Sequence, residues 1–64
     1  MPSYCMFAID SNEQVRATSL HLCANDGGAM TEASDYLRWH PAVEIWKGER
    51  LVARLDRQGS HLAA

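Results

Sequence analysis

The chain has 64 residues, enough for one small domain and no more. Hydrophobic residues make up 47% of the sequence and charged residues 22%, a composition typical of a folded protein and not of a disordered one. The formal net charge is −2, so nucleic acid is not the favoured partner. A domain of this size has a thin stability margin, which a disulfide, a metal or a partner subunit usually reinforces.

The sequence favours a cytoplasmic location. No apolar run approaches the ~20 residues that a membrane-spanning helix needs. The first ten residues lack the basic region and the long apolar stretch of a secretory signal. In the cytoplasm, Cys5 and Cys23 are expected to stay reduced.

The N-terminal part predicts a β-hairpin. Residues 3–9 are an apolar strand, residues 10–13 a polar turn, and residues 14–24 a second strand rich in β-forming types. We expect the two strands to pair across a loop of roughly five residues.

This hairpin argues against a disulfide. It places Cys5 opposite Ser19 or Leu20, so Cys23 lies about 10–13 Å further along the second strand. A disulfide requires Cα atoms within about 7 Å of each other. We therefore expect two buried structural thiols.

The next segment changes to a helical period. One helical face collects apolar side chains, namely Ala29, Met30, Ala33, Tyr36 and Leu37. Asn25 or Asp26 can cap the start, and Pro41 disfavours helical geometry before it, so the helix ends near residue 38 or 39. A helix of about 12 residues is marginal alone and must be held by packing.

Residues 42–47 and 50–56 predict a second hairpin around Gly48. With a two-residue type II′ loop at Gly48-Glu49, Trp46 pairs with Leu51 and the next pair is Ile45 with Val52. A three-residue loop instead places Glu44 opposite Arg54, which is an attractive cross-strand charge pair. Turn chemistry favours the first register and charge matching favours the second; the first is preferred.

The predicted fold is α+β with the order ββαββ: a small antiparallel four-stranded sheet with one helix on one face. The domain covers residues 1–56, and residues 57–64 are expected to form a flexible C-terminal tail.

Both faces of this sheet carry apolar side chains. In the preferred register one face holds Val43, Ile45 and Val52, and the other holds Ala42, Trp46, Leu51, Ala53 and Leu55. A single helix covers only one face, and a bare apolar face on a small protein usually marks an interface. The simplest partner is a second copy in a two-fold dimer.

The order of YCMFAID, HLCANDGGA and VEIWKGERLVARL resembles a group of short uncharacterised proteins, about 60–70 residues long, common in alphaproteobacteria. The similarity covers roughly residues 3–56 and is most specific at the last hairpin. It implies a bacterial source and no particular chemistry. Gly27-Gly28 departs from the acidic helix start expected in such proteins.

Few residues are candidates for a metal-binding, catalytic or phosphate-binding role. The soft metal ligands are His21, His40, His61, Cys5 and Cys23. Their spacing forms no zinc motif, so we expect no metal and no cofactor. Ser19 lies close to His21, but no carboxylate is placed to orient the imidazole, so we expect no enzyme activity. Gly27-Gly28 opens a helix without the lysine of a phosphate-binding loop.

The sequence therefore predicts a non-enzymatic interaction module that forms homodimers through its sheet. The residues expected at the interface are Trp39, Trp46, Leu51, Ala53 and Leu55. One alternative is an accessory or regulatory subunit of a larger cytoplasmic protein complex, bound through the Trp46 hairpin or by edge-strand addition. A second is a weak nucleic-acid-binding adaptor that uses Arg38, Arg50, Arg54 and Arg57.

Overall fold

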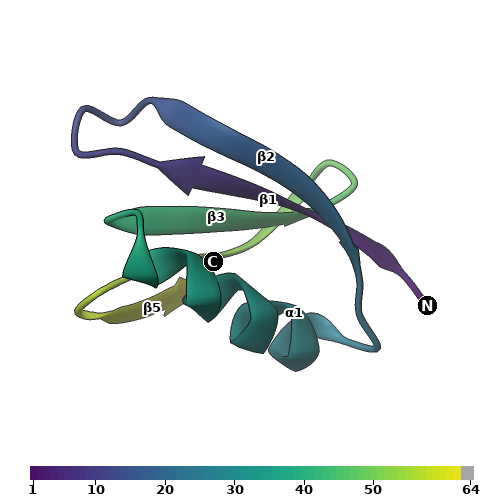
Figure 1. The fold of residues 1–64 in the computed structure, drawn as a ribbon. Coiled ribbons are helices and arrows are strands. Elements are labelled where there is room, and N and C mark those ends of the chain that lie inside the picture. Colours follow the sequence, from purple (N-terminus) through teal and green to yellow (C-terminus); the bar gives the residue numbers. More distant parts are fainter. Residues whose placement is uncertain (63–64) are drawn as a thin grey trace.

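The computed structural model describes the backbone of residues 1–62 and the side chains of residues 1–60. Seven elements follow in order (Figure 1): β1 (Ser3–Ile9), β2 (Val15–Leu22), α1 (Asp26–Ala33), the 3-10 helix η1 (Ser34–Arg38), β3 (Ala42–Lys47), β4 (Arg50–Asp56) and β5 (Gly59–Leu62). The predicted α+β class is confirmed, but the sheet has five strands where four were predicted.

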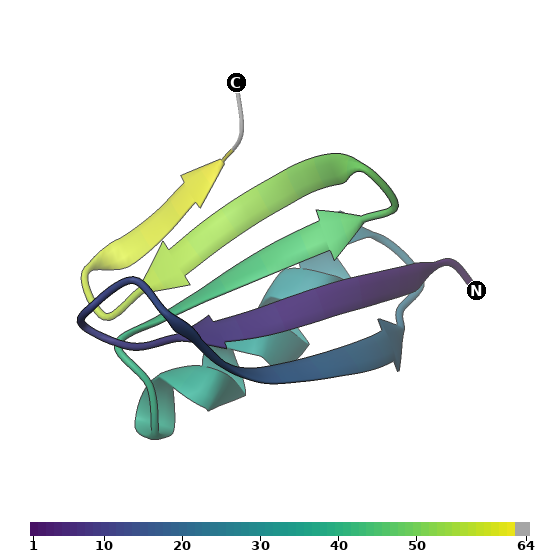
Figure 2. The ribbon, with the colours of Figure 1, turned by 90° about the horizontal axis from the view of Figure 1, so that it is seen from above.

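The strands form one antiparallel sheet in the order β2-β1-β3-β4-β5. Because β2 and β3 are both antiparallel to β1, they run in the same direction on either side of it. The helical segment links them across one face of the sheet (Figure 1). Figure 2 looks onto the opposite face, where the helical segment lies behind the strands and the loop of the first hairpin crosses in front of the ends of β1 and β3.

The fifth strand corrects the prediction of a loose tail. Gly59–Leu62 pairs antiparallel with β4, with Gly59 opposite Asp56. The connecting turn is fixed by the Asp56 carboxylate, which accepts from the backbone N–H of Gln58 at 2.8 Å. Gly59 takes a φ of +146°, which side chains disfavour. Residues 63–64, also part of the predicted tail, lie outside the described residues.

The first hairpin has the predicted pairing, with Cys5 opposite Leu20. Its loop is organised by Asp10, whose carboxylate accepts from the backbone N–H groups of Asn12 and Gln14 at 2.8 and 3.0 Å. The Gln14 N–H, followed by the Arg16 guanidinium, lowers the pKa of Asp10. These contacts determine where β2 begins.

The second hairpin combines both predicted registers. Gly48 has a φ of +61°, as a type II′ turn requires at its first central position, and Trp46 lies opposite Leu51. A β-bulge then follows between Trp46 and Ile45, so that Val52 is the extra residue and Ile45 pairs with Ala53. The predicted Ile45–Val52 pair is therefore wrong.

Beyond the bulge the charge pair of the second register is present, because Glu44 lies opposite Arg54. Turn chemistry and charge matching are thus each satisfied in a different part of the same hairpin. Relative to the predicted register, the bulge shifts the part of β4 after Val52 by one residue. The side chains in that part therefore lie on the opposite faces from those predicted.

The core lies between the helical segment and one sheet face. Its buried residues are Tyr4, Met6, Cys23, Ala29, Ala33, Val43, Ile45, Val52, Ala53 and Leu55. Ala53 and Leu55 are 0% and 5% exposed. The prediction that they share a face with Trp46 is wrong, because the bulge turns them towards the helix.

The helix begins and ends where predicted but changes type midway. The Asn25 side chain caps it by accepting from the N–H of Gly28 at 2.8 Å. Ala29 and Ala33 are fully buried against the sheet. The chain then tightens into η1, which ends at Arg38.

Two glycine-to-alanine substitutions test this account of the turn and the helix. Gly48→Ala is expected to destabilise the fold by about 1 kcal/mol, because alanine disfavours the positive φ of the turn. Gly28→Ala is expected to stabilise it by about 0.5 kcal/mol, because its Cβ meets Asn25 at an ordinary 3.5 Å in a helical backbone. Urea denaturation of both variants measures the two effects. Changes in stability of equal size and the same sign in the two variants would contradict the positive φ at Gly48 and the helical backbone at Gly28.

Candidate interaction surface

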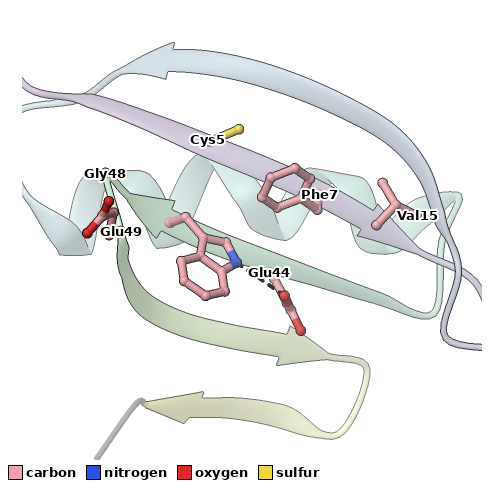
Figure 3. A pocket seen from close by; sticks show the side chains of 7 residues that line it. Cys5, Phe7, Val15, Glu44, Gly48 and Glu49 are labelled. Carbon is pink, nitrogen blue, oxygen red and sulfur yellow. Dashed lines mark hydrogen bonds between the residues drawn. The ribbon is translucent and has the colours of Figure 1, made fainter.

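The sheet face opposite α1 is called the open face. Its centre is a shallow groove with a volume of about 570 Å³, lined by Cys5, Phe7, Val15, Glu44, Trp46, Gly48 and Glu49. Figure 3 shows the Phe7 ring from β1 on this face, with the helix behind the sheet. Trp46 from β3 lines the same groove. Pairing in the sheet explains this, because Cys5 lies opposite Trp46 and Phe7 opposite Glu44.

β2 contributes the most exposed part of the open face. Leu20 is 71% exposed, Leu22 64% and Val15 54%. Leu20 lies opposite Cys5, and alternation along the strand places Leu22 on the same side. Among the described residues, three of the five exposed large hydrophobic side chains therefore belong to one strand. Such a concentration of apolar surface is unusual for a solvated strand.

The charges on the open face form a connected group. Glu44 accepts from the indole N–H of Trp46 at 3.1 Å and from the Arg54 guanidinium at 3.1 Å. Arg54 also donates to Glu13 at 2.7 Å. The hydrogen bond to Glu13, and then the charges of Glu13 and Glu44, raise the pKa of Arg54. Two carboxylates share one guanidinium, so the group is negative on balance.

The structure brings together two of the five predicted interface residues. Trp46 and Leu51 lie opposite each other on the open face, both half-buried. Trp39 is 77% exposed, but it follows η1 and lies near the other end of β3 from Trp46. Ala53 and Leu55 are in the core and are not available to a partner.

Sequence reasoning missed the contribution of Val15, Leu20 and Leu22. The signal was present, because pairing Cys5 with Leu20 also places Leu20 and Leu22 on the face that carries Cys5 and Phe7.

A polar cluster joins β2 to the helical segment on the other side of the sheet. The Ser19 hydroxyl lies 2.9 Å from Nε2 of His21, which is also 2.9 Å from the Tyr36 hydroxyl. Ser19 and Tyr36 are in direct hydrogen-bond contact. The rings of His21 and Tyr36 meet edge to face.

A carboxylate does lie near this imidazole, contrary to the prediction. Oε1 of Glu32 is 3.8 Å from Nδ1 of His21, brought there by the helix from 11 positions away in sequence. That distance is longer than a hydrogen bond. Ser19, His21 and Tyr36 line neither the groove on the open face nor the groove between Met30 and Leu55. The cluster acts here as a polar link between layers.

Cys23 occupies a different environment from Cys5. It is 3% exposed, and its thiol donates to Oε2 of Glu32 at 2.7 Å. This hydrogen bond and burial raise the pKa of Cys23 to about 11. Both cysteines are free thiols, and Cys5 is half-buried at the groove.

The Asp26 carboxylate, in the first turn of α1, offsets the positive partial charge at the N-terminus of this helix. Asp26 accepts from the Tyr4 hydroxyl at 2.7 Å and lies 3.4 Å from Arg50. The Tyr4 hydrogen bond, and then the Arg50 charge, lower the pKa of Asp26. A carboxylate at this position would repel a bound phosphate.

Two of the four predicted nucleic-acid residues, Arg50 and Arg54, form ion pairs within the chain. Arg50 and Arg54 face carboxylates, and Arg57 donates to the backbone carbonyl of Leu37 at 3.1 Å. The charges of Arg50 and Arg54 are therefore offset within the chain, whereas a neutral carbonyl leaves the charge of Arg57 in place. Among the described residues no group of three histidine, cysteine or acidic side chains is arranged to hold a metal. The side chain of His61 lies outside the described residues.

Comparison with family models, curated proteins and solved structures found no match. The resemblance to the short alphaproteobacterial proteins therefore stays a prediction. In the described part of the chain, no helix has the length and apolar character needed to cross a membrane.

The two thiols are expected to differ in reactivity. At pH 8 a thiol reagent should modify Cys5 readily and Cys23 very slowly, because only about one Cys23 in a thousand is then a thiolate. Unfolding in urea should expose Cys23, so that the reagent then modifies both thiols of each chain. Since the folded pKa of Cys23 exceeds its ordinary value of 9.0, its stabilising effect is complete below about pH 9 and lost as the pH rises through 11. Two equally fast thiols in the folded protein would contradict this environment.

The polar cluster can be tested as a structural link with a double-mutant cycle. Ser19→Ala and Tyr36→Phe are each expected to destabilise the fold by about 1 kcal/mol, because each removes one hydroxyl from the cluster. The double variant should lose less than the sum, with a coupling of about 0.5–1 kcal/mol. Urea denaturation provides all four values, and strict additivity would show that the hydroxyls do not act together.

Proposed function

We propose that this chain is a small, non-enzymatic, cytoplasmic interaction module that self-associates through the apolar surface of its sheet. The observation that carries the proposal is the exposure of Leu20, Leu22 and Val15 beside the half-buried Cys5–Trp46 groove. Two free cysteines support a reducing compartment.

The helical segment cannot cover this surface. α1 and η1 pack against β3 and β4 on the other side of the sheet. The hydrophobic effect therefore favours covering the exposed apolar side chains of β2 with another molecule, at ~25 cal/mol per Å² of apolar area removed from water.

One observation favours a second candidate, an accessory subunit that binds a larger protein. Glu13, Glu44 and Arg54 leave the open face negative on balance, and Glu49 lines the groove. A partner with a basic and apolar surface would complement it. Copurification from a native lysate with a defined larger protein, in place of a second copy, would favour this candidate.

The test is the oligomeric state of the wild type and two variants. The wild type is expected to form dimers as its concentration rises in analytical ultracentrifugation. Leu20→Lys should be monomeric at the same concentrations, because it introduces a charge into the apolar surface. Its stability should change little, because Leu20 makes few contacts within the chain.

Trp39→Ala is the matched control, since it removes an equally exposed apolar side chain elsewhere on the molecule. It should dimerise like the wild type. A wild type that remains monomeric at every concentration would reject self-association. A dimer lost in Trp39→Ala and kept in Leu20→Lys would move the interface away from the sheet.

A further inference from the structure

We propose that the second copy joins edge to edge, by antiparallel pairing of β2 with β2 of its partner, to form one continuous ten-stranded sheet. This inference rests on the proposed self-association and specifies its geometry. Two copies could otherwise stack with their open faces together, and the structure provides reasons to prefer the edge.

The outer edge of β2 lacks the features that keep sheet edges apart. β2 has eight residues and pairs, within residues 1–62, with β1 alone. Proteins usually protect such an edge with lysine, proline or a very short strand. The segment from Ala17 to Leu22 contains no charged residue and no proline. The opposite edge, β5, has four residues within the described part of the chain.

The one charge in β2 does not protect its outer half. Arg16 is held at the loop end of the strand by Asp10, with 2.7 Å between Nε and Oδ2. From residue 17 onwards, unpaired backbone groups and exposed leucines lie together on the same strand. This combination is a template for adding another strand.

Charge favours the edge over the face. Stacking the open faces would bring the negative groups around Glu44 and Glu13 of two copies close together. In edge pairing, β3 lies two positions from β2, so the Glu44 side chains of the two copies are about 24 Å apart at ~4.8 Å per strand. That separation is beyond the Debye length of ~8 Å at physiological salt, so their repulsion is screened.

The strand is also complementary to itself. An antiparallel pairing centred on residue 20 brings Leu20 of one copy against Leu20 of the other and Leu22 against Thr18, all on the same side of the sheet. Two-fold symmetry repeats each contact, so both copies cover both leucines. The area is smaller than in a standard interface, and such contacts are weak and concentration-dependent.

Amide hydrogen exchange, followed by NMR at several concentrations, tests the geometry directly. Alternate N–H groups of β2 point away from β1 and should exchange freely in the monomer. In a sample that is about 90% dimer, their exchange should slow about tenfold, because only the remaining monomer exchanges freely. The amides of β5 serve as the internal control and should not change.

The rate of alkylation of Cys5 provides a second measurement on the same samples. Edge pairing leaves the groove open, so its rate of alkylation should stay within about twofold across the concentrations, whereas face stacking would slow it. A dimer with unprotected β2 amides overturns the edge geometry and leaves the proposed self-association standing. A chain that stays monomeric overturns both.

Discussion

The organisation of this protein depends on a mismatch in width between its two layers. A helix with its side chains is about 10–12 Å across, whereas five strands span roughly 19 Å between the axes of the outermost two. α1 and η1 lie over β3 and β4. β2, at the far edge, is therefore outside the reach of most helical side chains, and all of its residues are exposed or half-exposed. The exposed leucines follow from this geometry.

A single extra residue determines what each face of β4 shows. The bulge at Val52 places Ala53 and Leu55 under the helix while Leu51, before it, stays beside Trp46. In regular pairing, Ala53 and Leu55 would lie on the open face and Arg54 would point into the core. Burying that guanidinium away from Glu44 and Glu13 would cost several kcal/mol. The bulge thus permits a tight glycine turn and a correctly placed ion pair in the same strand.

Much of the fold could be predicted from local sequence. The bounds of β1, β3 and β4 agree with alternation and turn residues, and the helix follows from the spacing of its apolar residues and the cap at Asn25. The bulge could not be predicted, because turn chemistry and charge pairing each imply a different regular register, and only an extra residue in β4 satisfies both. β5 was missed because an edge strand needs no apolar alternation; its backbone pairing with β4 suffices. The carboxylate near His21 depends on tertiary packing, which sequence spacing does not show.

The polar cluster and the exposed leucines are best understood together, since they occupy opposite sides of one strand. Ser19 and His21 point towards the helical segment and meet the Tyr36 hydroxyl, while Leu20 and Leu22 point the other way. An edge strand with few apolar contacts opens locally at low free-energy cost. The hydrogen bonds to Tyr36 raise that cost and hold β2 in extended pairing with β1. A strand kept extended loses less conformational entropy when another strand joins it, so the link that stabilises the isolated chain would also favour the proposed edge-to-edge association.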